Sequence, residues 1–462
     1  MNDYRRIADR LADDIAEGRL RPGERLPPQR VFARRRGIAG STAGRVYAEL
    51  VRRGLVVGEV GRGTFVRASP AGPGGGRGIV ESATAAPVNL ELNYPSAPGQ
   101  SELLAPALAP LLRPDVLTVA LRPAAVAGTP AAREAAAGLL ATPGWRPAPE
   151  RFLFAGNARQ AIAAALASLV RPGGRVGVET LTYPVVKEIA VRLGITLVPL
   201  VTDEGGVCPE AVAAAHRAAP LSALYVQPTL HNPTSLTMTD ERRHRLARTV
   251  VELDLPVVED RIWSFLADPS DAEPLAALAP GLTHVVDGLS KRVAPGLTVG
   301  FLVVPPHRTD TVAAAVRSGG WSAGRFALEA AVRWLADGTV DRLVDAKRAD
   351  AGRRQRIVAE ELHGFSVRSD PRAYYAWWEL PAPWRADTFT AAAAAHGIAL
   401  TPGPAFVVDP HRTPDAVRLG LASVPETDLR RALRTLADVA TRGADARGGR
   451  GGPDGLDGLG GR

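Results

Sequence analysis

Short apolar runs alternate with longer, helix-length segments between about residue 87 and about residue 440 of this chain. Each run has the composition of a buried strand, and the segments between several of them are long enough for helices. The expected strands cover residues 151–155, 175–179, 196–201, 223–227, 256–260, 284–287 and 298–304. This alternation predicts an α/β domain in which helices cover a mostly parallel sheet. Because ligands bind at the carboxyl ends of strands in such sheets, polar residues just after the strands are candidate site residues.

The first 67 residues follow a different pattern. Ile7, Leu11 and Ile15 recur at helical spacing, and glycine-containing segments separate the shorter elements that follow. We expect helices over residues 28–36 and 41–53 and strands over residues 55–59 and 64–67. Three helices followed by a glycine-tipped hairpin predict a winged helix-turn-helix. In that arrangement the third helix enters the major groove of DNA and the hairpin tip contacts the backbone or the minor groove.

Composition separates these two regions from each other and from the end of the chain. Residues 68–86 contain Pro70-Ala71-Gly72-Pro73-Gly74-Gly75-Gly76, which cannot form a core and predicts a flexible linker. Residues 441–462 are rich in Gly, Arg and Asp, so we expect a disordered tail. The predicted organisation is a DNA-binding domain at 1–67, a linker at 68–86, a large domain at 87–440 and a tail at 441–462.

Charge and cysteine content narrow the class of protein further. Residues 1–66 hold 14 arginines against 8 acidic residues, which favours a nucleic-acid partner for the N-terminal domain. The single cysteine, Cys208, excludes an internal disulfide framework and a cysteine metal cage, and we expect no metal site. The chain shows neither a run of about 20 apolar residues nor a signal-peptide core, so we expect a cytoplasmic protein without membrane contact.

Lysine is rare in this chain. The 56 basic residues include only three lysines, which are Lys187, Lys291 and Lys347. A lysine amine can lose its proton and attack an aldehyde, whereas arginine stays protonated. Lys291 lies shortly after the predicted strand 284–287, at the edge of the sheet where ligands bind. It is therefore the first candidate catalytic residue, and a surface lysine in a turn is the alternative.

Two segments near the start of the large domain have the chemistry of a ligand site. Asn157, Ala158 and Arg159 link the strand 151–155 to a helix, and a helix start offers free backbone amides and a positive dipole end to a phosphate. Tyr183 follows the next strand and can place its ring over a planar ligand. Each signal is weak alone, because such residues also occur in ordinary turns and cores.

Two further residues follow later strands. Asn232, in an Asn-Pro turn after the fourth strand, can donate its amide hydrogen to a phenolate oxygen. Asp260 ends the fifth strand, where a carboxylate can keep the nitrogen of an aromatic ring protonated. A protonated pyridine ring is an electron sink, which carbanion chemistry at an amino acid requires.

Three motifs in the N-terminal domain are Gly18-Arg19-Leu20-Arg21-Pro22-Gly23-Glu24-Arg25-Leu26-Pro27, Tyr47-Ala48-Glu49-Leu50 and Gly61-Arg62-Gly63-Thr64-Phe65-Val66. With these motifs the domain resembles the GntR family of bacterial transcription regulators, which implies binding to double-stranded operator DNA. Ala39-Gly40 stands where the family usually has a Ser-Arg pair at the start of the recognition helix. The candidate DNA contacts are Arg30, Ser41, Thr42, Arg45 and Arg62.

The phosphate turn, the tyrosine, the Asn-Pro turn, the strand-end aspartate and Ser290-Lys291 follow one another in an order that resembles fold type I pyridoxal-phosphate enzymes, the aspartate aminotransferase superfamily. Together with the N-terminal domain, the chain resembles MocR-type regulators, the GntR subgroup with an aminotransferase-like effector domain. This resemblance implies a mostly parallel sheet with flanking helices and a smaller C-terminal α+β subdomain. It also implies pyridoxal 5′-phosphate as the cofactor.

The resemblance assigns roles to individual residues. It implies an aldimine on Lys291, an ion pair between Asp260 and the pyridine nitrogen, and binding of the ring oxygen by Asn232. Tyr183 would stack on the ring, and Arg418 matches the arginine that binds the carboxylate of an amino-acid substrate or effector. The remaining residues that we expect around the cofactor are Asn157, Ala158, Arg159, Ser290 and Arg292.

Several positions depart from the superfamily pattern. Thr298 replaces a phosphate-binding arginine, Gly288 replaces a hydroxyl residue, and Ile262 stands where a tyrosine is common. The tyrosine that usually precedes the Gly128-Thr129-Pro130 turn is absent as well. We hypothesise that Arg292 or Arg159 supplies the missing positive charge.

Three functions remain open at this stage. The first is a transcription regulator that senses pyridoxal phosphate or an amino-acid-like effector. The alternative is an active aminotransferase with a DNA-binding arm, and a third reading is a GntR-type repressor whose effector domain no longer holds the cofactor. A homodimer is implied by the resemblance, because fold type I sites lie at a two-fold interface.

Overall fold

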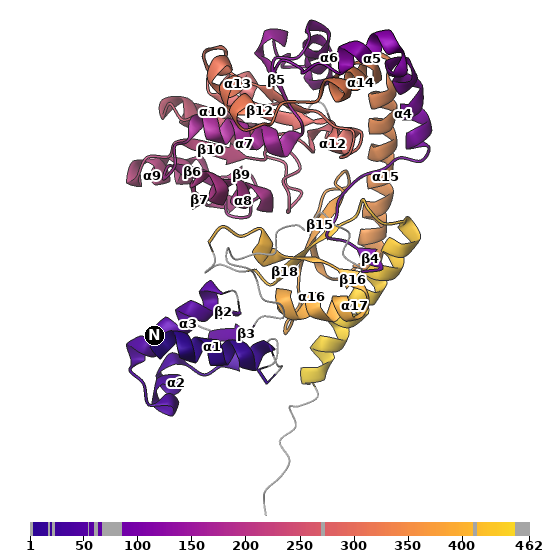
Figure 1. Ribbon diagram of the computed structural model, residues 1–462. Helices are drawn as coiled ribbons and strands as arrows, with labels where there is room; N and C mark the ends of the chain where they lie inside the picture. The colour runs from indigo at the N-terminus through magenta and orange to yellow at the C-terminus, as the bar shows by residue number, and fades with distance from the viewer. Residues whose placement is uncertain are drawn as a thin grey trace, which may run out of the picture.

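The computed structural model describes residues 3–16, 19–20, 24–53, 55–59, 63–66, 86–268, 273–409 and 414–448 of the 462-residue chain. These residues form an N-terminal module, a large domain around a seven-stranded sheet, and a small domain around a four-stranded sheet (Figure 1). The long helix α15, Thr339–Glu361, runs from the large domain into the small one (Figure 1).

The N-terminal module has the predicted winged helix-turn-helix arrangement. Its elements are α1 (Asp3–Ala16), β1 (Arg25–Leu26), α2 (Gln29–Arg36), α3 (Gly40–Arg52), β2 (Val56–Glu59) and β3 (Gly63–Val66). Gly37 ends α2 in the left-handed conformation (φ 63°), which lets the chain turn sharply into α3. Leu11, Val46 and Leu50 lie in a core between the helices. The short strand β1, which the sequence pattern did not predict, pairs antiparallel with β3.

Two of the predicted domain boundaries can be compared with the structure. Apart from Ala86, the expected linker at 68–86 lies outside the described residues. The last helix, α17, covers Glu426–Gly448 and so continues past Ala440, where we expected the large domain to end. The expectation of disorder is therefore wrong for residues 441–448, and the rest of the expected tail lies outside the described residues.

All seven predicted strands of the large domain lie in one sheet, with the order β5-β13-β12-β11-β10-β6-β7. Neighbouring strands pair in parallel except at β13, which is antiparallel to both β12 and β5. The mostly parallel sheet is thus confirmed. Its strands are β5 (Phe152–Ala155), β6 (Arg175–Glu179), β7 (Thr196–Leu200), β10 (Ala223–Val226), β11 (Val257–Asp260), β12 (Thr283–Gly288) and β13 (Gly300–Val303).

Helices cover both faces of this sheet, and alternate residues of β10 show how. Ala223 and Tyr225 pack into a core shared with helices α7, α8 and α13, whereas Leu224 and Val226 pack into another shared with α9, α10 and α11. Strands that are buried on both faces need continuous apolar runs, which is why the sequence pattern found them. The helices are α4 (Gln100–Leu108), α5 (Pro114–Ala120), α6 (Pro130–Leu140), α7 (Ala158–Leu169), α8 (Pro184–Leu193), α9 (Pro209–Ala218), α10 (Asp240–Glu252), α11 (Leu275–Leu278), α12 (Leu289–Arg292), α13 (Thr309–Ser318) and α14 (Arg325–Ala336).

The small domain is the expected C-terminal α+β subdomain. Its antiparallel sheet has the order β14-β15-β18-β17, and its core contains Trp378, Phe389 and Leu433. The segment that precedes the large domain in sequence also belongs to the small domain, because its strand β4 (Val88–Asn89) pairs with β16 (Ile398–Ala399). The remaining elements are β14 (Ser366–Ser369), β15 (Tyr375–Glu379), α16 (Ala386–Ala395), β17 (Thr401–Pro402) and β18 (Ala416–Gly420).

Within the described part of the chain, no single helix is both long enough and apolar enough to cross a membrane. The bent pair Gln100–Leu112 and Pro114–Ala120 passes the same test by length and composition only.

Candidate functional site

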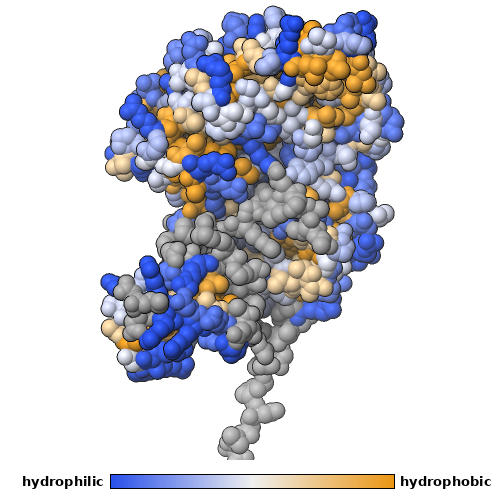
Figure 2. Space-filling view, in the orientation of Figure 1, coloured by the Kyte–Doolittle hydropathy of each residue, from blue (hydrophilic) through white to orange (hydrophobic). Residues whose placement is uncertain are grey.

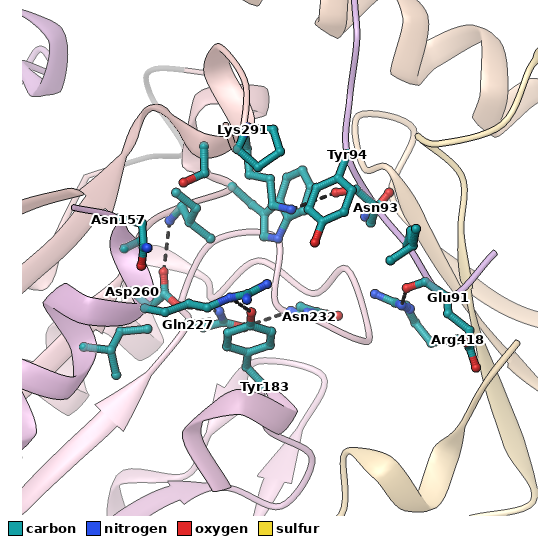
Figure 3. Close-up of a pocket in the computed structure, with 18 of the residues that line it drawn as sticks. Glu91, Asn93, Tyr94, Asn157, Tyr183, Gln227, Asn232, Asp260, Lys291 and Arg418 are labelled. Carbon is teal, nitrogen blue, oxygen red and sulfur yellow. Dashed lines mark hydrogen bonds between the residues drawn. The ribbon is translucent and has the colours of Figure 1, made fainter. Parts of the chain in front are cut away.

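A cavity of about 490 Å³ lies where the carboxyl ends of β6, β10, β11 and β12 face the small domain. Figure 3 shows side chains from both domains pointing into it. Nine of the residues predicted from the sequence line this cavity, which are Asn157, Ala158, Arg159, Tyr183, Asn232, Asp260, Ser290, Lys291 and Arg418. The topology of a parallel sheet brings most of them together, because they follow strands or start helices at the same edge.

Lys291 reaches the cavity from the short helix α12, which directly follows β12. Its Nζ atom donates a hydrogen bond to the Asn93 carbonyl oxygen at 2.8 Å and lies 4.4 Å from the ring centroid of Tyr94. Burial, together with the smaller effects of the nearby cations Arg159 and Arg418, lowers the pKa of Lys291 to about 7. A large fraction of this amine is therefore unprotonated near neutral pH, as a nucleophile requires.

Three donors point at the carboxyl group of Asp260. Its Oδ2 atom accepts hydrogen bonds from the Tyr225 hydroxyl at 2.7 Å and the Gln227 amide at 2.8 Å, and Oδ1 accepts one from the Ile262 N–H at 3.1 Å. The pKa of Asp260 is raised above its usual value, because burial outweighs the three hydrogen bonds that lower it. The donors hold the carboxyl group at the end of β11, at the wall of the cavity (Figure 3).

The turn that carries Asn232 is strained and tightly held. Leu230 and Ser235 have positive φ angles of 47° and 60°, a conformation that non-glycine residues keep only when their surroundings enforce it. His231 Nε2 lies 3.0 Å from the Leu181 carbonyl oxygen and so ties this turn to the one before Tyr183. The buried Asn232 Oδ1 atom has no hydrogen-bond partner among the described residues.

The start of helix α7 forms a turn suited to an anion. The Asn157 side chain accepts a hydrogen bond from the Gln160 N–H at 3.0 Å, which caps the helix and leaves the first amides of α7 to other acceptors. Gly300 packs so closely against this turn that a Cβ atom would lie 2.4 Å from the Asn157 carbonyl group. Beside it, the hydroxyl oxygens of Ser290 and Thr298 are 2.9 Å apart.

Arg159 and Arg292, the two arginines expected to supply the missing positive charge, line different cavities. Arg159 lines the cavity, and its Nε atom donates to the Tyr183 hydroxyl at 3.0 Å (Figure 3). Arg292 is buried, pairs with both carboxylate oxygens of Asp287 and donates to the Gly288 carbonyl oxygen. It lines a different, smaller cavity, so the expectation that Arg292 is a cofactor-binding residue is wrong.

Arg418 reaches the cavity from β18 in the small domain. It donates to the Glu91 carbonyl oxygen and, at 2.9 Å, to the Thr401 hydroxyl, while its buried Nε atom has no partner among the described residues. Burial lowers the pKa of Arg418 to about 10, which still leaves it charged at neutral pH. The side chain is thus a cation at the cavity wall, which suits a carboxylate.

Several lining residues were not predicted from the sequence. They are Glu91, Leu92, Asn93, Tyr94, Ile162, Gln227, Trp263, Pro295 and Gly296. Gln227 directly follows β10, so the strand-end argument applied to it as well. The segment 91–94 carries no such signal, because it reaches the cavity only through the pairing of β4 with the small domain.

The candidate DNA contacts lie on the N-terminal module. Arg30, Ser41 and Arg45 are exposed or partly exposed, Thr42 is half-buried, and Arg62 lies outside the described residues. Ser41, Thr42 and Arg45 belong to the first two turns of α3, the part of a recognition helix that reaches base edges. The surface of the module is largely hydrophilic in the view of Figure 2.

Two family models match the chain and together cover most of it. Residues 3–66 match bacterial regulatory proteins of the gntR family, and residues 123–436 match aminotransferase class I and II. The chain belongs to the aminotransferase class I and II family and carries a GntR-type helix-turn-helix domain. The predicted fold class and MocR-type organisation are thereby confirmed, and the family implies pyridoxal phosphate as the cofactor.

Similar proteins include regulators and enzymes. The uncharacterized HTH-type transcriptional regulator YdeF of Bacillus subtilis is 27% identical over 435 residues, which cover 94% of this chain and 93% of that protein. The HTH-type pyridoxine biosynthesis transcriptional regulator PdxR of Corynebacterium glutamicum is 28% identical over 215 residues, 46% of each chain. A double mutant of Thermus thermophilus aspartate aminotransferase has a TM-score of 0.67 and 26% identity, covering 76% of this chain and 91% of its own.

Proposed function

We propose that this protein is a cytoplasmic, homodimeric transcription regulator that binds operator DNA through α3 and pyridoxal phosphate through Lys291. One observation carries the proposal: a buried lysine amine shares a cavity with Asp260, with the Asn232 amide and with the start of α7. The lysine amine matches the aldehyde of the cofactor, and Asp260 matches its ring nitrogen. The Asn232 amide matches its ring oxygen, and the start of α7 matches its phosphate.

The residues of the cavity fit the cofactor. Asp260 would pair with the pyridine nitrogen, and the Asn232 side-chain amide would donate a hydrogen bond through Nδ2 to the ring oxygen. Tyr183 would lie against the ring, and the Ala158 and Arg159 amides with the Arg159 side chain would bind the phosphate. When bound, the cofactor supplies an aldehyde and a ring that withdraws electrons.

The remaining steps use this chain's own groups. Lys291 would supply the unprotonated amine that captures the aldehyde of the bound cofactor. The Asn93 carbonyl and the rings of Tyr94 and Trp263 close the cavity around Nζ of Lys291. Arg418 would hold the carboxylate of an amino-acid-like effector at the opposite wall (Figure 3).

An exposed apolar patch supports the homodimer. Leu112, Val119 and Leu121 are 65%, 44% and 77% exposed, and Figure 2 shows apolar surface over α4 and α5. A patch of this kind is typical of a protein interface, and a second copy of the chain is its expected occupant. A dimer also presents two α3 helices to the two halves of an operator.

Turnover as an aminotransferase is the second candidate, because Lys291, Asp260 and Arg418 share one cavity. Ile262 argues against efficient turnover, since an apolar side chain occupies the position where the superfamily has a phenol. A cofactor-free repressor is the third alternative, and the cavity that Lys291 shares with Asp260 and Asn232 argues against it.

Absorbance and reduction test the cofactor. The wild-type protein mixed with pyridoxal phosphate should gain a visible band, and borohydride should fix the cofactor on Lys291 with a matching mass increase. Lys291→Ala should gain no adduct, and Lys187→Met, in which another lysine is removed, should behave as wild type. A colourless wild-type protein without an adduct would leave a repressor that lacks the cofactor.

Footprinting tests the regulator. Protection of the DNA beside the protein's own gene should change with pyridoxal phosphate, and Arg45→Ala should weaken protection in both conditions. An added amino acid should change the spectrum without forming keto acid over many turnovers. Sustained keto-acid production would favour the aminotransferase instead.

A further inference from the structure

Lys347, the third lysine of the chain, is fully buried beneath the turn that carries Lys291. Its side chain extends from the middle of α15, and its Nζ atom donates to three successive backbone carbonyl oxygens. The distances are 3.1 Å to Lys291, 2.9 Å to Arg292 and 2.7 Å to Val293. Three converging acceptors match the three N–H bonds of an ammonium group.

Helix α12 needs such support because it has only four residues. A single helical turn is unfavourable by itself, and its last carbonyl oxygens have no partners within the helix. A cation at the C-terminal end satisfies these oxygens and interacts favourably with the helix dipole. The chain then leaves the helix at Val293 with φ −108° and ψ −91°, outside the helical region.

The position of Lys347 is itself fixed by its neighbours. The Tyr374 hydroxyl donates to the Lys347 carbonyl oxygen at 2.7 Å and to Asp350 at 2.9 Å. Asp350 in turn pairs with Arg354 one helical turn further along α15. Arg348, which follows Lys347 in α15, donates to the carbonyl oxygens of Phe265 and Ala267. Helix α15 therefore also holds the segment that follows Asp260.

We propose that Lys347 is a positioning residue, which fixes α12 so that the Lys291 amine points into the cavity at the place where the cofactor aldehyde binds. This inference rests on the proposed function. It assigns Lys347 no contact with the cofactor, because Lys347 does not line the cavity. Burial lowers the pKa of Lys347 itself to about 7, so it carries part of a positive charge at neutral pH, and that charge also lowers the pKa of Lys291.

The other lysine offers a matched control. Lys187 Nζ donates to the Ala405 carbonyl oxygen at 2.9 Å, so it too holds a backbone carbonyl, but on a different loop. Replacing either lysine by methionine keeps most of the side-chain volume and removes the donors and the charge. Only the replacement at 347 should affect the Lys291 turn.

The experiment uses the full-length protein and two ligands that differ in one group. Pyridoxal 5′-phosphate has the aldehyde that Lys291 captures, whereas pyridoxine 5′-phosphate lacks it and reports binding of the ring and phosphate alone. Covalent capture is followed by the visible band and by the mass of the borohydride-reduced adduct, and the affinity for pyridoxine phosphate is measured by calorimetry.

Lys347→Met should slow capture at saturating pyridoxal phosphate by roughly tenfold or more, because a small displacement of the nucleophile lowers the rate of its attack. The affinity of this variant for pyridoxine phosphate should stay within about twofold of wild type. Lys347→Arg should recover part of the rate, since a guanidinium keeps the charge and several donors. Lys187→Met should match wild type in both measurements.

Wild-type capture rates in Lys347→Met would overturn the inference. The inference would also be overturned if Lys347→Met and Lys347→Arg lost capture of pyridoxal phosphate and affinity for pyridoxine phosphate to the same extent. That result indicates a general defect of the fold. If Lys347→Met does not fold, Lys347→Gln takes its place with the same expected split between the two ligands. If the folded wild-type protein captures no pyridoxal phosphate, the proposed function itself is refuted. That result differs from the failure of this inference, in which wild type and Lys347→Met capture the cofactor at the same rate.

Discussion

The proposed cofactor pocket has a ring end, formed by Asp260, Gln227 and Asn232, and a phosphate end, formed by the turn 157–159 with Ser290. At the ring end, the carboxylate of Asp260 accepts three hydrogen bonds and is buried inside the protein. At the phosphate end, Thr298 stands in place of the phosphate-binding arginine of the superfamily, and Gly288 stands in place of a hydroxyl residue. The Arg159 side chain there is shared with the Tyr183 hydroxyl.

This difference separates recognition of the cofactor from retention of the cofactor. The ring end can select and orient the pyridine ring, whereas a thinner set of phosphate contacts lets the cofactor leave more readily. An enzyme gains from holding its cofactor permanently, but a sensor must release it when its concentration falls. The contrast between the two ends therefore favours a regulator that responds to pyridoxal phosphate.

The largest expected effect concerns the arginine beside Lys291. Arg292→Ala should lower the free energy of unfolding by roughly 3–5 kcal/mol, because it leaves the buried Asp287 carboxylate without its partner. Urea denaturation measures this loss. Arg113→Ala breaks an exposed pair with Asp115 and should cost at most about 1 kcal/mol. A stable Arg292→Ala protein with weakened phosphate binding would return Arg292 to the phosphate end.

Asp260→Asn tests the ring end. It removes the anion that pairs with the ring nitrogen and sets an amide against the donors Tyr225 and Gln227, so affinity for pyridoxal phosphate should fall by about 2 kcal/mol, roughly 30-fold. Absorbance titration measures the change. Tyr225→Phe removes one of the three donors and should produce a smaller loss. Equal affinities of Asp260→Asn and wild type would show that the ring end does not bind the ring nitrogen.

The sequence predicted the sheet and most of the ring end for a physical reason. Buried strands such as β10 and β11 need continuous apolar runs, and a parallel sheet brings the residues after those runs to one edge. The order of the residues along the chain was therefore enough to place Asp260 and Asn232 beside Lys291. Gly37 and the glycine-flanked hairpin marked the N-terminal module in the same local way.

What the sequence did not predict depends on orientation and on distant contacts. Arg292 is adjacent to Lys291 in sequence, but successive side chains on a helix point about 100° apart, so one faces the cavity and the other faces Asp287. The segment 91–94 reaches the site through pairing with the small domain, about 300 residues later in the chain. The end of α17 was missed because arginine and alanine suit helices as well as tails.

Arg159→Ala tests the phosphate end. Its affinity for pyridoxal phosphate should fall roughly tenfold, because the variant removes the charged donor that faces the phosphate. Its affinity for pyridoxal, which lacks the phosphate, should stay unchanged. Loss of affinity for both compounds would instead assign Arg159 to the Tyr183 contact at the ring.

Thr298→Arg sharpens the contrast from the opposite direction. An arginine at this position, next to the Ser290 hydroxyl, should tighten binding of pyridoxal phosphate by roughly threefold to tenfold and slow its release on dilution. Thr298→Ser keeps the hydroxyl and should behave as wild type. If Thr298→Arg releases the cofactor as fast as wild type does, the thin phosphate end is not what controls retention.

The smallest expected effect is a shift in the pH profile of capture. Lys291 must be unprotonated to attack the aldehyde, so the wild-type capture rate should rise with pH through a midpoint near its pKa of about 7 and level off above it. Arg159 is the neighbouring cation that lowers this pKa most after burial, so Arg159→Ala should move the midpoint to higher pH. Lys187→Met, which leaves the cavity intact, should keep the wild-type midpoint. A midpoint that stays in place in Arg159→Ala would mean that the charge of Arg159 does not affect the pKa of Lys291.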